Sequence, residues 1–125
     1  MMKKEVNISE SEWSVMEILW SSPLSTIGEI KKSLSDTGWS DSTIKTLVRR
    51  LVSKKAIAIN DEAATFRYYP LLSQQDCRLK ETKSFINRVY DGSVSMLMTN
   101  LAAESNLTEK ETKELLSLID KMGKG

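Results

Sequence analysis

Hydrogen-bonding and cationic side chains are concentrated in one short stretch of the chain, between residues 40 and 54. Serine and threonine hydroxyls come first and can bond to phosphate oxygens or to base edges. Lysine and arginine follow and reach further, to guanine edges or to the phosphodiester backbone. Taken alone, this composition is more typical of a solvated helix face. We predict contacts with DNA because the stretch falls on the third expected helix, after a turn and before a hairpin that carries Arg67. The candidate DNA-contacting residues of this stretch are Ser40, Ser42, Thr43, Lys45, Thr46, Arg49, Arg50 and Lys54.

These side chains can act together only if a single element holds them on one face. Apolar residues recur in the same stretch at the i, i+3, i+4, i+7 and i+8 spacing of a helix with one buried face. The sequence therefore predicts a helix that begins after Ser40, packs one side on a core and presents a polar, cationic side. The residues of the apolar stripe are Ile44, Leu47, Val48, Leu51 and Val52.

Two helices are expected before this one. Serine or threonine followed three residues later by glutamate is typical of a capped helix start, and Ser9 with Glu12 and Thr26 with Glu29 fit that pattern. Pro23 ends the first helix because proline disfavours a helical residue before it. The expected first helix covers residues 10–21, and the second lies between Thr26 and a turn at residues 36–38.

The periodicity changes to that of β-strands after the basic helix. Ala56–Ile59 and Thr65–Tyr69 are rich in β-branched and aromatic residues. They predict a β-hairpin with its tip near Asp61–Ala64 and its second strand ended by Pro70, which cannot donate to a ladder. Arg67 in the second strand is expected to contact a phosphate or the minor groove beside the main site.

The order of these elements, three helices and then a hairpin, is that of a winged helix-turn-helix. The expected fold class is mainly α with a small β-hairpin (α+β), with a winged-helix DNA-binding domain over residues 1–72. Residues 73–125 are expected to form three helices, the first ending near Asp91–Gly92 and the last capped by Thr108 with Glu111. Three helices are little for an independent core. Their apolar stripes therefore need a partner, either the first half of the chain or a second copy of it.

Composition excludes most catalytic and metal-binding machinery. The 125 residues include no histidine and a single cysteine, Cys77, so His-based catalysis, an internal disulfide and a thiolate metal site are ruled out. We expect no cofactor, no metal and no enzymatic activity. A hydrolase is the most distant alternative, because Asp61 and Glu62 lie at a predicted loop tip without a partner base.

Charge is nearly balanced, with 18 basic and 17 acidic residues and a formal net charge of +1. Binding to polyanions through overall charge is therefore excluded. Between residues 43 and 55, however, the sequence has five basic residues and no acidic one, which predicts a narrow cationic surface. No segment is apolar enough to span a membrane or serve as a signal peptide, and a cytoplasmic protein without membrane insertion is expected.

Four segments, in order and with similar spacing, resemble the BlaI/MecI penicillinase repressor family. They are Glu12–Trp20, Trp39–Leu51, Phe66–Tyr69 and Phe85–Gly92. The resemblance covers nearly the whole chain and implies a homodimeric repressor that occupies a double-stranded operator with dyad symmetry. Such operators often lie upstream of β-lactamase or penicillin-binding-protein genes.

The resemblance also implies which residues read DNA. The residues on which the family's reading helix falls are Ser40, Ser42, Thr43, Lys45, Thr46 and Arg50, with Arg67 in the wing. Arg49 and Lys54 are added from the helical pattern and not from the resemblance. Asp41 and Ser42 depart from the commonest family residues, proline and lysine. The helical stripes of the second half are expected to form the dimer through Phe85, Val89, Val94, Leu97, Leu101, Leu115, Leu118, Ile119 and Met122.

Related resistance repressors are released when a protease of a sensor pathway cuts an Asn–Phe bond in the dimerisation region. The matching position here is Asn100–Leu101, which keeps the asparagine and lacks the aromatic residue. Leu101 is alternatively a packing residue of the dimer interface. Copper-responsive relatives carry paired cysteines near the C-terminus, and this sequence has none, so copper sensing is not expected.

A protein-interaction module is the main alternative to a repressor, because winged helices also serve as assembly domains that never touch DNA. Trp13 and Trp20 lie on the apolar stripe of the first helix and are expected to pack in the core. Cys77 is expected to be an inert thiol.

Overall fold

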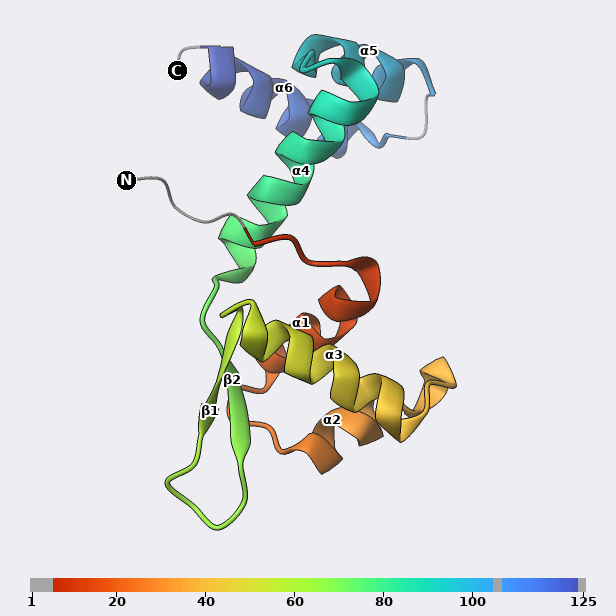
Figure 1. Ribbon diagram of the computed structural model, residues 1–125. Coiled ribbons are helices and arrows are strands. Elements are labelled where there is room, and N and C mark those ends of the chain that lie inside the picture. Colours follow the sequence, from red (N-terminus) through yellow and green to blue (C-terminus); the bar gives the residue numbers. More distant parts are fainter. Residues whose placement is uncertain (1–5, 105–106, 124–125) are drawn as a thin grey trace, which may run out of the picture. The chain divides into compact units, whose positions relative to one another are not determined.

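The computed structural model describes residues 6–104 and 107–123 and divides the chain into two compact units, Met1–Cys77 and Arg78–Gly125 (Figure 1). In its described residues, the first unit contains helices and a two-stranded hairpin, and the second is helical. The expected mainly α fold with a small hairpin is confirmed. Because helix α4 (Gln74–Tyr90) runs through the boundary between the units, the domain division at residue 72 stays a prediction.

The first unit is built on the helices α1 (Glu10–Ser21), α2 (Ile27–Ser33) and α3 (Asp41–Ser53). The expected capping boxes are confirmed, since Ser9 and Thr26 each exchange hydrogen bonds with the glutamate three residues on. Ser40 caps α3, where its hydroxyl oxygen accepts a hydrogen bond from the Thr43 N–H at 3.2 Å. A 3-10 turn, η1 (Ser35–Thr37), precedes α3.

The hairpin consists of the antiparallel strands β1 (Ile57–Asn60) and β2 (Arg67–Pro70). The second strand begins two residues later than expected, so the loop at the tip is longer. The first pair of the ladder joins Arg67 to Asn60, and the Tyr68 N–H donates to the Ser25 carbonyl at 2.8 Å in an isolated bridge to the loop after α1. Pro70 is the last residue of β2, as expected.

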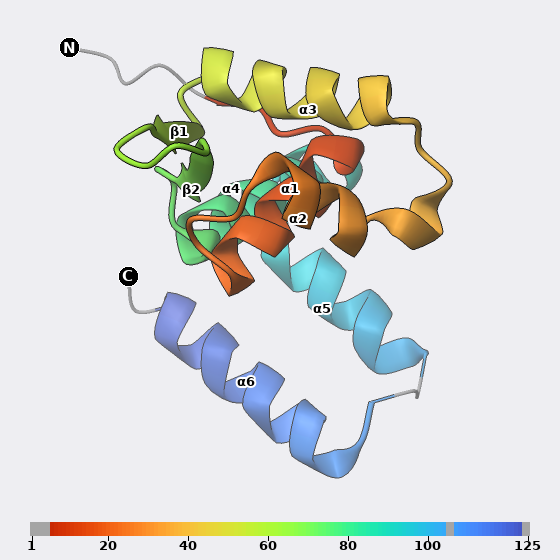
Figure 2. The same cartoon turned by 90° about the horizontal axis from the view of Figure 1, so that it is seen from below.

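The core of the first unit lies where α1, α2 and α3 meet the base of the hairpin. Figure 2 shows α3 along one edge of this unit, with α1 and α2 on its inner side. Val15, Met16, Leu19, Ile30 and Leu51 are fully buried. The stripe predicted for α3 is confirmed at four positions, which are buried, and Val52 packs partly buried against the same core.

Trp20 fixes the end of the hairpin segment to α1. Its indole N–H donates to the Leu72 carbonyl at 2.9 Å, and its ring meets Trp13 edge to face with centroids 5.3 Å apart. Trp20 also packs partly buried against the core, while Trp13 is half-buried. The packing predicted for Trp20 agrees with this position, whereas the half-buried Trp13 packs on the Trp20 ring.

The second unit is formed by the rest of α4 together with α5 (Val94–Ala103) and α6 (Glu109–Gly123). The predicted end of α4 is confirmed by Asp91 and Gly92, whose φ angles of 51° and 84° are left-handed. Thr108 and Glu111 form the expected capping box before α6. In the described part of the chain, no helix has the length and apolarity needed to cross a membrane.

Candidate nucleic-acid interface

Helix α3 separates a buried face from an exposed cationic face. Ile44, Leu47, Val48 and Leu51 are at most 4% exposed, whereas the side chains on the opposite side face solvent. In Figure 2, α1 and α2 lie on one side of α3, and no labelled element of the first unit lies on the other. A helix whose back is fixed on a core and whose front is open is the arrangement that a DNA-reading helix requires.

Lys45, Arg49 and Arg50 are the exposed cations of this face. None of them forms an ion pair with a carboxylate in the described residues. Lys45 and Arg49 lie one helical turn apart and therefore on the same side of α3. Their positive charges are available to an anion from outside the chain.

Hydroxyl groups surround the start of α3. The Ser40 oxygen lies 3.1 Å from the Ser42 hydroxyl and 3.0 Å from that of Thr43, and the Thr46 hydroxyl donates to the Ser42 carbonyl at 2.8 Å. Apart from Thr46, which is half-buried, these side chains are exposed. Together with the positive end of the helix dipole, these hydroxyls form an end of α3 that is suited to a phosphate.

Asp41 is the one acidic residue within α3, and a lysine of α2 partly neutralises it. The Lys31 ammonium lies 3.3 Å from the Asp41 carboxylate, whose side chain is 76% exposed. Sequence reasoning missed this pair, because the two residues lie on different helices. The pair lowers the repulsion that Asp41 would otherwise exert on a phosphate.

Lys54 is bonded within the protein. Its ammonium donates to the Glu12 carboxylate at 2.5 Å and to the Asn7 carbonyl at 2.7 Å, and Glu12 is only 1% exposed. Burial raises the pKa of Glu12, but the hydrogen bonds from Lys54 and Ser9 and the charge of Lys54 outweigh burial, so the pKa lies below its ordinary value. The pairing gives Lys54 a structural role, and its contact with DNA stays a prediction.

Arg67 lies in β2 and reaches back to the loop before α2. Its guanidinium donates to the Leu24 carbonyl at 3.0 Å and lies 3.4 Å from the Glu29 carboxylate. Hydrogen bonds from Thr26 lower the pKa of Glu29, with the charge of Arg67 adding to them. Since Arg67 and Glu29 are both exposed, their ion pair contributes little to stability, and a contact of Arg67 with phosphate stays a prediction.

The residues expected at the dimer interface belong to the helices of the second unit. Phe85, Val89 and Leu101 are 40%, 52% and 39% exposed, while Val94 and Leu97 are half-buried. These five side chains leave apolar surface uncovered on α4 and α5. The side chains of Leu115, Leu118, Ile119 and Met122 lie outside the described residues.

The bond between Asn100 and Leu101 lies inside α5. The Asn100 side-chain amide donates to the Tyr90 hydroxyl at 3.2 Å. A protease that binds an extended substrate would reach this bond only after part of α5 had unfolded. Cleavage at this position stays a prediction.

Comparison with known proteins agrees with this geometry. A family model described as penicillinase repressor matches residues 8–121. The chain is 34% identical to the methicillin resistance regulatory protein MecI of Staphylococcus aureus (strain N315) over 122 residues, which cover 97% of this chain and 99% of that protein. It is 32% identical to a penicillinase repressor of Bacillus licheniformis over 120 residues, or 95% of this chain and 94% of that one.

A solved structure adds a likeness in three dimensions. It is that of the B. licheniformis repressor BlaI in its monomeric form, in complex with the blaP half-operator. The match has a TM-score of 0.52 and 37% identity, and it covers 60% of this chain and 93% of that one.

Proposed function

The chain belongs to the penicillinase repressor family, and on that premise we propose that it represses transcription as a homodimer bound to double-stranded operator DNA. Operator binding would place its action in the cytoplasm. The regulated genes would be of the kind named for its relatives, which are a methicillin resistance regulator and a penicillinase repressor. Family membership favours this function over that of an assembly module.

The observation that carries the proposal is the outer face of α3. Three exposed cations, which form no ion pair in the described residues, lie beside exposed hydroxyls, while the opposite face is buried. We propose that this helix enters the major groove, where arginine can read guanine and the hydroxyls can bind base edges or phosphates. The proposed contacts are made by Ser40, Ser42, Thr43, Lys45, Thr46, Arg49 and Arg50, with Arg67 on a flanking phosphate.

The second unit supports the dimer. Phe85 and Val89 on α4 and Leu101 on α5 are large apolar side chains that stay exposed in a single chain. A second copy would cover them and release the ordered water around them. Two-fold symmetry then sets two copies of α3 in successive major grooves, with half-site centres about 34 Å or a small multiple apart.

The inducing route is proposed from family membership alone. A cognate sensor-protease pathway would release the repressor by cutting the dimerisation helices near Asn100. Leu101 replaces the aromatic residue that the family resemblance leads one to expect, so we propose that the protease accepts an aliphatic side chain.

Selection of bound duplexes from a random DNA pool tests the function directly. The full-length chain should enrich an inverted repeat, and genomic copies of this repeat should lie in promoter regions. If folded, dimeric protein enriches no sequence at low salt, the proposal is contradicted.

A further inference from the structure

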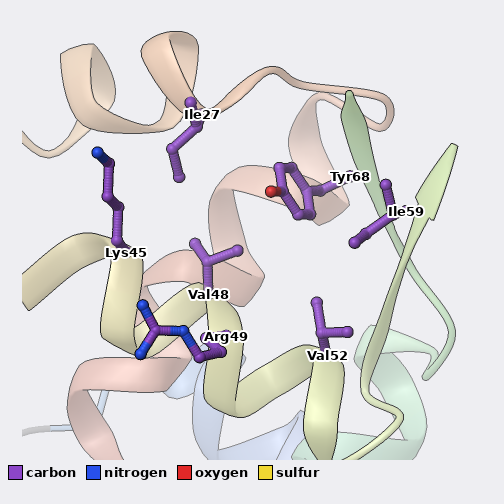
Figure 3. Close-up of a pocket in the computed structure, with 7 residues that line it drawn as sticks. All are labelled: Ile27, Lys45, Val48, Arg49, Val52, Ile59 and Tyr68. Carbon is purple, nitrogen blue, oxygen red and sulfur yellow. The ribbon is translucent and has the colours of Figure 1, made fainter. Parts of the chain in front are cut away.

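A cavity of about 320 Å³ lies between α2, α3 and the β-hairpin, within the first unit. Figure 3 shows that its lining side chains come from all three elements and face a common space. This volume is at the lower end of the range for small-molecule sites. The apolar part of its lining is made by Ile27, Val48, Val52, Ile59 and Tyr68.

The cationic part of the lining comes from α3 alone. Lys45 and Arg49 stand at one side of the cavity, and Lys45 extends toward α2 (Figure 3). Neither forms an ion pair in the described residues. The planar guanidinium of arginine matches a carboxylate in shape and can bind both of its oxygens.

The apolar wall is formed before any ligand binds. Ile59 and Tyr68 are cross-strand partners, and the Tyr68 N–H is bonded to the Ser25 carbonyl at 2.8 Å, so the hairpin is tied to the loop after α1. Val48 is 3% exposed and belongs to the core. Because the wall is already formed, the ligand loses less binding free energy to the ordering of protein side chains.

Ile59 leaves apolar surface open beside the cavity. Ile59 is 40% exposed, although Ile57, two residues earlier in β1, is 1% exposed. An apolar group placed against Ile59 and Tyr68 would remove this surface from water. The site thus offers an apolar wall and two adjacent cations, which are complementary to a molecule with an apolar body and one anionic end.

We propose that this cavity binds a small carboxylic acid with an aromatic or branched apolar body, and that this ligand weakens DNA binding. Its carboxylate would lie between Lys45 and Arg49 and its apolar body against Ile59 and Tyr68. The second part of this proposal, that the ligand weakens DNA binding, is the regulatory half. It rests on the proposed function, because Lys45 and Arg49 are also proposed DNA contacts. A ligand that binds the free protein better than the DNA complex lowers DNA affinity by linkage.

Binding is tested without DNA, by titrating the full-length ¹⁵N-labelled chain with 3-phenylpropanoate and following amide shifts. The expected shifts are saturable and centred on Ile27, Val48, Ile59 and Tyr68. The neutral isostere 3-phenylpropanamide should bind at least about tenfold more weakly, because it cannot pair with the two cations. Equal binding of acid and amide, or shifts confined to other regions, would overturn the proposal.

Two variants and one control locate the site. Ile59→Trp fills the apolar wall and should abolish the shifts while DNA binding is retained. The double variant Lys45→Gln Arg49→Gln should bind acid and amide equally weakly. Lys32→Gln removes an exposed cation of α2 away from the cavity and should leave the titration unchanged. Unaltered acid binding by folded Ile59→Trp and by the double variant would rule the cavity out.

Competition with DNA separates the ligand from the proposed function. With wild-type protein, 3-phenylpropanoate at saturation should weaken operator binding several-fold, and 3-phenylpropanamide at the same concentration should not. Operator binding that is unchanged by a saturating acid would overturn the regulatory half. A chain that binds no DNA at all would contradict the proposed function, and the titration would still decide whether the ligand site exists.

Discussion

Lys54, at the end of α3, is a basic residue that was expected to contact DNA and that bonds to a buried carboxylate of α1. Position along a basic helix therefore does not by itself identify a DNA contact. Lys45, Arg49 and Arg50, which have no such partner in the described residues, are the better candidates.

The Lys54→Met variant measures how much Lys54 contributes to the free energy of unfolding. Removing the ammonium leaves the Glu12 carboxylate buried with fewer partners, and the free energy of unfolding at neutral pH should fall by about 1–3 kcal/mol. Lys55→Met is the matched control, because Lys55 is exposed and should change stability little. Urea unfolding of both variants checks this, and equal stability of wild type and Lys54→Met would contradict the structural role.

The same variant has a predicted pH dependence. The pKa of Glu12 lies below its ordinary value of 4.5, so its pairing stabilises the protein above that pH and is lost as the pH falls through the lowered pKa. The stability difference between wild type and Lys54→Met should therefore be largest near neutral pH and shrink as the pH falls below 4.5. A difference that stays constant over this range in urea unfolding would show that the carboxylate is not involved.

Arg50→Ala tests direct reading of a base. If the guanidinium binds a guanine through two hydrogen bonds, the variant should lose about 1–3 kcal/mol of operator affinity and discriminate less at one base pair. Folding should be unaffected, because Arg50 is exposed and has no ion pair in the described residues. Fluorescence anisotropy with the operator and with single-base variants checks this, using Lys32→Ala as the control. If the variant loses affinity equally for all of these duplexes, Arg50 contacts a phosphate and does not read a base.

At the scale of elements, helix starts could be predicted from sequence because their causes are local. The capping pairs at Ser9, Thr26 and Thr108 lie within one turn of the residues that they fix. The bond between the Tyr68 N–H and the Ser25 carbonyl could not be predicted, because it joins residues that lie far apart in the chain.

The site was predicted in the same uneven way. The exposed face of α3 follows from its apolar stripe, since the residues off the stripe must face away from the core. The ion pairs of Lys54 with Glu12 and of Arg67 with Glu29 join residues far apart in the chain. Local spacing holds no information about such pairs, nor about a cavity shared by two helices and a hairpin.

Val89→Glu tests the role of α4 in the dimer. Val89 is 52% exposed in the single chain, so a charge there should leave the protein folded but should be costly when a second copy covers it. Analytical ultracentrifugation should show a shift from dimer to monomer, and operator affinity should fall with it. Lys83→Glu, at another exposed position of α4, is the control. If Val89→Glu dimerises as strongly as the wild type, then this face of α4 is not part of the dimer interface.

At the scale of the whole molecule, near-neutral charge and DNA binding are compatible because the cations are local. The chain has 18 basic and 17 acidic residues, yet α3 presents three exposed cations on one face. One such face supplies few phosphate contacts, and two copies double them. Dimerisation and DNA affinity should therefore be coupled.

The salt dependence of operator affinity tests this account most directly. Affinity of the full-length chain is measured by anisotropy at increasing salt, on a duplex with the complete inverted repeat and on one with a single half-site. Each neutralised phosphate contributes about 0.9 to the slope of log affinity against log salt, so the complete operator should show about twice the slope of the half-site. Affinity that does not fall with salt, or equal slopes on both duplexes, would contradict a dimer that binds DNA through the cationic faces of two α3 helices.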